Sequence, residues 1–123
     1  MQVSDGEGLD AVPDCLFCKI VAGDIPAEIV STTEYTVAFR DINPQAPTHV
    51  LVIPRLHAPD VASLALASPE AAAALLVETR RIAMGEGHDS YRLVFNTGAD
   101  AGQTVFHAHG HVLAGRGLDW PPG

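Results

Sequence analysis

The chain has 123 residues and 47% of them are hydrophobic, so it can bury one core and has the size of one domain. Its 15 acidic residues outnumber its 7 basic residues, and the net charge of −8 argues against binding to nucleic acid or to an anionic membrane surface. No apolar run approaches the roughly 20 residues that span a bilayer. The acidic N-terminus, MQVSDGEGLD, lacks the pattern of a signal peptide, so we expect a cytoplasmic protein.

The N-terminal region predicts a short helix after a loose start. We expect residues 1–12 to form a flexible N-terminus and residues 13–123 to form a single domain, because no repeat or long linker divides the chain. The helix is predicted over 15–22, with Asp14 as its N-cap and Gly23 as its end.

Three strands are predicted next. EIVSTT (28–33) and YTVAFRD (35–41) read as neighbouring strands, because apolar residues alternate in the second of them. The two prolines of NPQAP (43–47) favour a turn. THVLVIP (48–54) then reads as a third strand that ends at its own proline.

Two helices are predicted in the middle of the chain. A short one lies around 60–66, and the main one follows Ser68, a preferred N-cap residue, with Pro69 in its first turn. The main helix continues through AAAALLVETRRIAM until Gly85 and Gly87. Its predicted apolar stripe consists of Leu75, Leu76, Thr79, Ile82 and Ala83.

The C-terminal third predicts two more strands. They cover YRLVFNT (91–97) and residues 103–114, and the glycine-rich turn GADAG separates them. The fold class is therefore α+β: a five-stranded antiparallel sheet with one main helix and a short N-terminal helix. The tail RGLDWPPG is irregular, and we expect its Trp120 to pack on something, such as another subunit.

Three of the six histidines occur in FHAHGHVLAGR, at every second position. In a strand, residues two apart point to one face, so His107, His109 and His111 are predicted to form a row of imidazoles. Phe106 and Val112 are then expected on the opposite face, in contact with the core. Gly110, between two histidines, weakens a strand unless another group packs closely against it.

Two chemistries use such a row of rings. One is a three-histidine metal site, as in some zinc hydrolases. The other is nucleophilic catalysis at phosphorus, for which imidazole is suited because much of it is neutral near pH 7. The preceding GADAGQT (98–104) favours phosphorus, because its small residues let backbone N–H groups approach an anion. Asn96 and Thr104 can add hydrogen bonds. The chain lacks both the P-loop and the dinucleotide-binding glycine patterns.

The sequence resembles the histidine triad (HIT) superfamily, and within it the Hint-like branch of purine nucleoside phosphoramidases. The stretches that carry the resemblance are CLFCKIVAGDIPAEIV, VAFRDINPQAPTHVLVIPRLH, AGQTVFHAHGHVLAGR and the closing WPPG. They cover residues 15–57 and 91–123. The resemblance implies a HIT-like fold, a homodimer in which the long helix and a strand pair across a two-fold axis, and a tail that reaches toward the partner's site.

The resemblance also implies catalytic roles. His109, the middle histidine, is expected to attack the α-phosphorus and form a nucleotidyl-imidazole intermediate that water then hydrolyses. His111 is expected to bond a phosphate oxygen, and Thr104 stands where the family often has serine, to help the leaving amine depart. His49 corresponds to a fourth family histidine that supports the triad from the next strand.

The nucleotide-binding residues follow from the same resemblance. Asp41 is expected to accept the two ribose hydroxyls, as a carboxylate can. The phosphate site is expected to be lined by Asn96, Gly102, Gln103, Thr104, Val105, His109 and His111. The base is expected in an apolar slot, whose residues can equally be ordinary core: Leu16, Phe17, Ile20, Phe39 and Ile42.

A second site is indicated by the C-x-x-C of Cys15 and Cys18. Some bacterial relatives hold zinc on such a pair plus two histidines, which here correspond to His57 and His107. Two thiolates and two imidazoles suit tetrahedral zinc, and this gives His107 a structural role. The alternative is a pair of reduced thiols with no ligand; a redox pair is disfavoured because no parallel βαβ pattern surrounds it.

The function expected from the sequence is hydrolysis of the P–N bond of nucleoside 5'-phosphoramidates, or of acyl- or aminoacyl-AMP, with release of AMP or GMP. A purine nucleotide is the expected substrate and structural zinc the expected cofactor. The alternatives are a dinucleoside polyphosphate hydrolase or nucleotidyltransferase of the same superfamily, or a nucleotide- or zinc-binding module without turnover. A complete row of histidines favours an enzyme, because a binding module needs no nucleophile.

Overall fold

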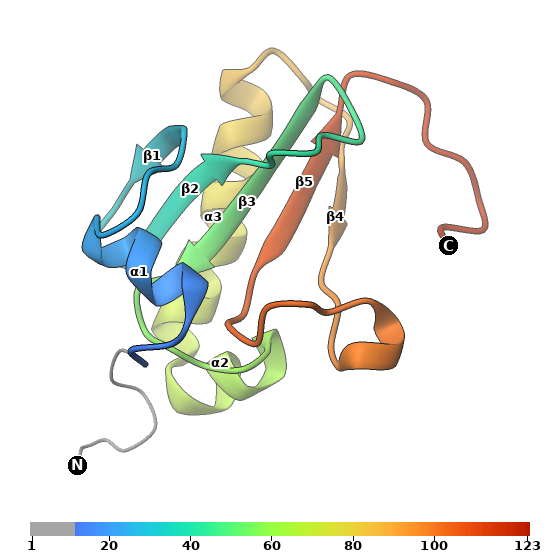
Figure 1. Cartoon of the computed structure of the whole chain (residues 1–123). Coiled ribbons are helices and arrows are strands. Elements are labelled where there is room, and N and C mark those ends of the chain that lie inside the picture. Colours follow the sequence, from blue (N-terminus) through green and yellow to red (C-terminus); the bar gives the residue numbers. More distant parts are fainter. Residues whose placement is uncertain (1–11) are drawn as a thin grey trace.

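A computed structural model describes residues 12–123, and their core is a five-stranded antiparallel sheet with the strand order β1-β2-β3-β5-β4 (Figure 1). The strands are β1 (Ile29–Thr32), β2 (Thr36–Arg40), β3 (Thr48–Pro54), β4 (Arg92–Val94) and β5 (Gly110–Ala114). The helices are α1 (Leu16–Ala22), α2 (Val61–Ala67) and α3 (Pro69–Gly85), with a short 3-10 helix at Ala99–Ala101. This confirms the predicted α+β fold class.

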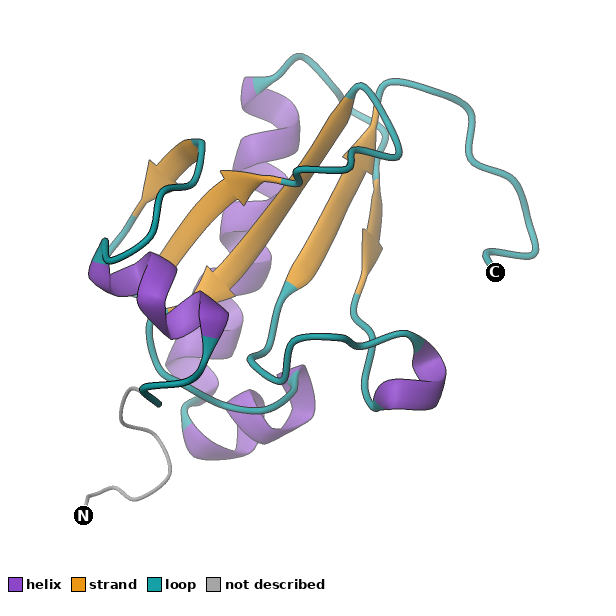
Figure 2. Cartoon of the chain, in the orientation of Figure 1, coloured by secondary structure: helices purple, strands orange, loops and turns teal. Residues whose placement is uncertain are grey.

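Helices cover both faces of the sheet. The long α3 runs behind the central strands, and α1 lies in front of β2 and β3 (Figures 1 and 2). All seven residues of β3 are buried, which is the expected result for a central strand with both faces covered. Within the described range, no helix is long and apolar enough to cross a membrane.

Side-chain alternation along β3 divides the core into two clusters. Val50 and Val52 pack in the cluster on the α3 side, together with Leu75 and Ile82 of that helix. The intervening residues of β3 face α1, where they join Phe17. The alternating pattern therefore places α1 and α3 on opposite faces of one sheet.

Helices α1 and α3 begin at side chains that cap them. Ser68 accepts a hydrogen bond from the Ala71 N–H at the start of α3, as predicted. At α1, however, the N-cap is Cys15, whose Sγ accepts from the Cys18 N–H (3.3 Å), so the prediction of Asp14 was wrong. Gly23 ends α1 with a left-handed backbone (φ 79°), as predicted.

The predicted strands 91–97 and 103–114 were both too long. β4 covers only three residues, and β5 begins at Gly110, because residues 103–109 bond to other loops instead of to a neighbouring strand. Two predicted apolar contacts also fail. Leu76 of the main helix is 49% exposed, and Phe106, which was expected to reach the core, is 51% exposed.

Candidate active site and metal-binding cluster

The three histidines do not form one row along a strand. Only His111 lies in β5, whereas His107 and His109 occupy the irregular segment before it. The rings of His109 and His111 are still neighbours, with centroids 5.1 Å apart. The His107 ring is turned instead toward the cysteines of α1. The triad is thus divided between two sites.

His109 has a defined tautomer. Its Nδ1 lies 2.8 Å from the backbone carbonyl oxygen of His107, and a carbonyl can only accept, so Nδ1 carries the proton. The lone pair of the neutral ring is therefore on Nε2. The edge of Phe17 packs against this ring, with centroids 5.0 Å apart and planes at 88°. The ring is thus oriented by one hydrogen bond and one aromatic contact.

A second chain of hydrogen bonds orients His111. The backbone N–H of Gln45 donates to Nδ1 of His49 (3.0 Å), which leaves the His49 proton on Nε2. That Nε2–H lies 3.0 Å from Nδ1 of His111 and 3.4 Å from a carboxylate oxygen of Asp41. Because Nδ1 of His111 accepts, its own proton is on Nε2. His111 therefore presents a hydrogen-bond donor next to the lone pair of His109.

Burial keeps these two supporting rings neutral. It lowers the pKa of His111 to about 4, and the adjacent rings of His109 and His49 add to the effect. Burial also lowers the pKa of His49, although the Asp41 carboxylate opposes the change. Both tautomer assignments above therefore apply at neutral pH.

A cleft of ≈ 420 Å³ lies beside these rings, between α1, β2 and the loop before β5. Its walls are largely apolar, with two carboxylates, Glu28 and Asp41, and the second oxygen of Asp41 accepts from the Asn43 N–H (2.8 Å). Eight predicted nucleotide-binding residues line it: Leu16, Phe17, Ile20, Phe39, Asp41, Ile42, Thr104 and Val105. Phe17 and Phe39 are also buried core, each 5% exposed, so the alternative interpretation as core applies to both, and their contact with a base stays a prediction.

The loop that precedes the triad is organised by the side chain of Gln103. Its side-chain Nε2 donates to the carbonyls of Pro59 (2.6 Å) and Val105 (3.0 Å), and its Oε1 accepts from the Gly98 N–H (2.9 Å). Both amide hydrogens are thus bonded within the protein, so the side chain cannot donate to a phosphate. The nearby Gly102 has a left-handed backbone (φ 97°), which favours glycine there. Asn96 lies beside Gly102.

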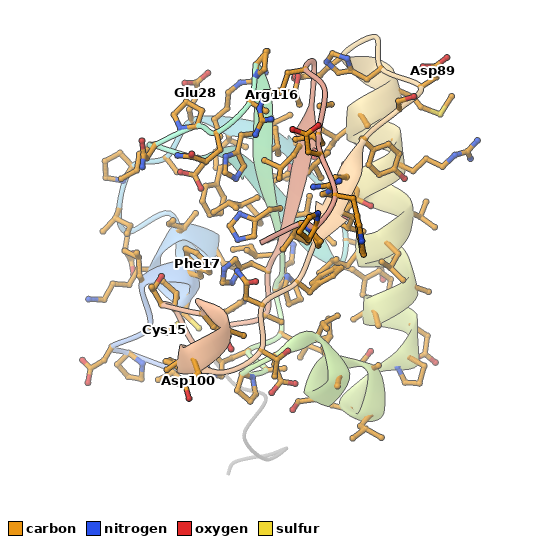
Figure 3. The ribbon with its side chains drawn as sticks, turned by 90° about the vertical axis from the view of Figure 1, so that its right-hand side faces the viewer. Cys15, Phe17, Glu28, Asp89, Asp100 and Arg116 are labelled. Carbon is orange, nitrogen blue, oxygen red and sulfur yellow. The ribbon has the colours of Figure 1, made fainter. Side chains whose placement is uncertain are left out.

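The second cluster consists of the four residues predicted to bind a metal. Cys15, Cys18, His57 and His107 place their ligand atoms within 4.8 Å of one another. Nδ1 of His107 is 3.4 Å from the Sγ of Cys15, 3.5 Å from the Sγ of Cys18 and 3.2 Å from Nδ1 of His57. Figure 3 shows Cys15, the residue before α1, near Phe17 of that helix.

The chemistry of these four donors fits zinc. His107 donates from Nε2 to the Pro54 carbonyl (2.8 Å), which leaves its Nδ1 lone pair facing the cluster. Burial lowers the pKa of His57, and lowers that of His107 to about 4, so both rings are in the neutral form that metals bind. Burial also raises the pKa of the Cys18 thiol to about 11, and zinc overcomes such an effect because it deprotonates a coordinating thiol.

Residues 22–118 match the model of the HIT domain family. The chain belongs to the HIT family. It is 41% identical over 107 residues to the purine nucleoside phosphoramidase of Escherichia coli, a match that covers 85% of the chain and 90% of the relative. It is 44% identical to a 14 kDa zinc-binding protein of Zea mays, over 88% of the chain and 87% of that protein. A crystal structure of a HIT family hydrolase from Legionella pneumophila superposes with a TM-score of 0.86 at 46% identity, over 89% of this chain and 100% of that one.

Two orienting groups of this HIT domain escaped the sequence analysis. They are the backbone N–H of Gln45, which sets the tautomer of His49, and the backbone carbonyl of Pro54, which sets that of His107. Both are main-chain groups: every residue has a backbone carbonyl, and every residue except proline has a backbone N–H. No side-chain pattern could have indicated them, and only the fold brings them to the rings.

Proposed function

We propose that this HIT protein is a nucleotidyl hydrolase that cleaves the P–N bond of purine nucleoside 5'-phosphoramidates, or the P–O bond that joins the carboxylate to the phosphorus of acyl- and aminoacyl-AMP, through a covalent intermediate on His109. The observation that carries the proposal is the tautomer of His109. Its Nδ1–H is held by the His107 carbonyl, so Nε2 has the lone pair that a nucleophile needs. The names of the Escherichia coli and Legionella pneumophila proteins support a hydrolase of this class.

In the first step, Nε2 of His109 bonds to the α-phosphorus and the P–N bond breaks. The Nε2–H of His111 donates to a phosphate oxygen while charge develops there. Removal of one such donor costs about 2.7–4 kcal/mol of transition-state stabilisation in comparable sites. Thr104, on the wall of the cleft, supplies a proton to the leaving amine and regains one from the water that attacks in the second step. In the second step, water attacks the phosphorus of the intermediate, releases AMP or GMP, and restores neutral His109.

The cleft supplies the rest of the substrate site. Asp41 accepts the two ribose hydroxyls, and the purine lies in the apolar slot between Leu16, Ile20 and Ile42. The backbone N–H groups of Thr104 and Val105, which line the cleft, bind the phosphate together with Asn96, whereas those of Gly98, Ala101, Gly102 and Gln103 already donate within the loop. Such a site binds an anion through neutral donors, which suits a chain with a net charge of −8.

The test is the His109→Ala variant, with His88→Ala as the matched control because His88 belongs to neither histidine site. We expect His109→Ala to release no amine from an adenosine 5'-phosphoramidate, while AMP still binds by calorimetry. Intact-mass analysis of quenched wild-type protein should show a nucleotidyl adduct that the variant lacks. Normal amine release by His109→Ala refutes the nucleophile. A panel that includes dinucleoside polyphosphates and nucleotidyl acceptors decides between this activity and its superfamily alternatives, and absence of turnover on all of them favours a binding module.

We further propose that Cys15, Cys18, His57 and His107 hold one structural zinc ion, which joins α1 to the sheet. The four donors and their protonation states support this, as does the name of the Zea mays relative. Protein purified without chelators should contain about one zinc per chain by metal analysis, and Cys15→Ser should lose it. The two cysteines form no disulfide, which suits a reducing compartment, so the cytoplasm is the proposed location.

A homodimer is the proposed assembly. Leu76, Val77 and Met84 are exposed on α3 beside Tyr91 and the edge strand β4, and they line a groove of ≈ 790 Å³. An apolar helix face next to an unpaired strand edge suits a symmetric contact with a second copy. Light scattering should give twice the chain mass, and Val77→Arg should give the monomer.

A further inference from the structure

His107 connects the two sites through two different parts of the same residue. Its ring faces the cysteines and His57, whereas its backbone carbonyl accepts the hydrogen bond from Nδ1 of His109 (2.8 Å). The side chain is fully buried, with 0% exposure. A group that holds the His107 ring in place therefore also affects the position of the carbonyl that orients His109.

A second connection runs through the backbone next to His57. The N–H of Ala108 donates to the carbonyl of Ala58 (2.7 Å), so the segment that carries His107 and His109 lies beside the segment that carries His57. Ala58 and Ala108 are each 1% exposed. This hydrogen bond holds the irregular segment before β5. A cluster ligand is adjacent to each of its ends, His57 next to Ala58 and His107 next to Ala108.

A third connection is Phe17, which lies in α1 between the two cysteines. Its ring packs edge-on against His107 (centroids 5.9 Å apart) and against His109 (5.0 Å). Phe17 also packs in the core with Phe39 and Ile53, so α1 has an apolar anchor that does not depend on a metal. The cleft wall formed by α1 should therefore persist when the cluster is empty.

We propose that the Cys15–Cys18–His57–His107 cluster, when it holds a metal ion, acts as a positioning device for His109. This inference rests on the proposed function. Without a metal, the four side chains meet only through S–H and ring N–H contacts of 3.2–3.5 Å, and sulfur is a weak partner in such bonds. A metal replaces these contacts with bonds of fixed geometry, so it restricts His107 and, through its carbonyl, the direction of the His109 lone pair.

The consequence is a separation of binding from turnover. The nucleotide cleft depends on the core cluster around Phe17, whereas alignment of His109 depends on the metal cluster. Displacement of catalytic groups by about 1 Å, or loss of an outer-shell partner, lowers activity by about 10- to 100-fold. We therefore expect the metal-free protein to have a kcat reduced by about this factor, with KM and the Kd of AMP unchanged.

The experiment compares the zinc-loaded full chain with the same protein after chelation and after reloading with Zn²⁺ or Co²⁺. Circular dichroism checks that the stripped protein is folded. Ring-¹⁵N NMR of histidine at one fixed pH reports the tautomer of His109, and steady-state kinetics give kcat and KM. The His57→Gln variant, which removes one ligand, is tested in parallel with His88→Gln as the control.

We expect the loaded protein to show one His109 tautomer with its proton on Nδ1, and the stripped protein and His57→Gln to show averaged ring signals and the lower kcat. Reloading should restore both in the wild type, and His88→Gln should match the wild type. The inference is overturned if the His109 signals and kcat are the same with and without metal, or if AMP binding and the fold are lost together with turnover. If the loaded protein hydrolyses no phosphoramidate, the proposed function fails, while the ¹⁵N signals still decide the positioning role.

Discussion

Gly110 separates His109 from His111 at the first residue of β5, and the structure predicts that even alanine disturbs this position. A Cβ built there lies 2.9 Å from Cε1 and from Cζ of Phe95 and 3.2 Å from Cδ1 of Leu93. Phe95 is half-buried against the core, so its ring has little room to move away. The close packing explains why a glycine stands between His109 and His111 at the start of β5.

The expected magnitude follows from two opposing effects. Inserting a methyl group into a packed site costs about 1–3 kcal/mol. Replacing glycine by alanine returns about 0.4–1 kcal/mol by restricting the unfolded chain. Gly110→Ala should therefore reduce the free energy of unfolding by about 1–2 kcal/mol, which lowers Tm by several degrees for a chain of this size.

Urea unfolding at one fixed protein concentration measures the effect, because association would otherwise shift the midpoint. Gly117→Ala is the matched control, since a Cβ there meets nothing within 4 Å. The double variant Gly110→Ala/Phe95→Leu should recover part of the loss. If Gly110→Ala unfolds at the same or a higher urea concentration than the wild type, the packing explanation is wrong.

Three further predictions concern single side chains. Ser68→Ala removes the N-cap of α3 and should lower the free energy of unfolding by about 1 kcal/mol in urea titrations. Glu78 is buried and accepts from Arg81 and Ser31; the hydrogen bond from Arg81, above all, lowers its pKa. The stabilisation that ionised Glu78 gives to the folded protein is therefore complete above its unfolded pKa near 4.5, and it is lost as pH falls through the lower folded pKa. Glu78→Gln should consequently be less stable than the wild type at pH 7 and equally stable in strong acid. Gln103→Ala breaks the hydrogen bonds that organise the loop 98–105, and it should reduce kcat in the amine-release assay while far-UV circular dichroism stays unchanged.

Local signals in the sequence predicted the parts of the fold that local forces determine. The bounds of THVLVIP (48–54) were correct, because a turn with two prolines precedes it and Pro54 ends it. The start of α3 was correct because Ser68 and Pro69 act on the adjacent backbone. The four metal-site residues also come together as predicted, although that prediction came from the resemblance to the HIT family.

The strand predicted over 103–114 failed because distant groups bind its first half. The Gln103 side chain bonds to Pro59, and the His107 ring bonds to Pro54. These partners are 44 and 53 residues away in sequence, so no periodicity within the segment reveals them. Alternation correctly indicated that the rings of His109 and His111 are neighbours, but it could not show that His107 faces a different cluster from the other two.

The proposed chemistry also explains how a chain with a net charge of −8 can act on a nucleotide. Five of its arginines are already bonded to carboxylates or backbone carbonyls within the described range: Arg40, Arg55, Arg81, Arg92 and Arg116. The donors that we propose for the phosphate are instead neutral: backbone N–H groups, Asn96 and the Nε2–H of His111. Because burial holds the pKa of His111 near 4, this ring stays neutral far below pH 7, and its Nδ1 continues to accept the hydrogen bond from His49. In the proposed mechanism, oriented neutral donors bind the phosphate and the lone pair of His109 is the reactive group. The orientation of that lone pair by the His107 carbonyl therefore matters more than any nearby cation.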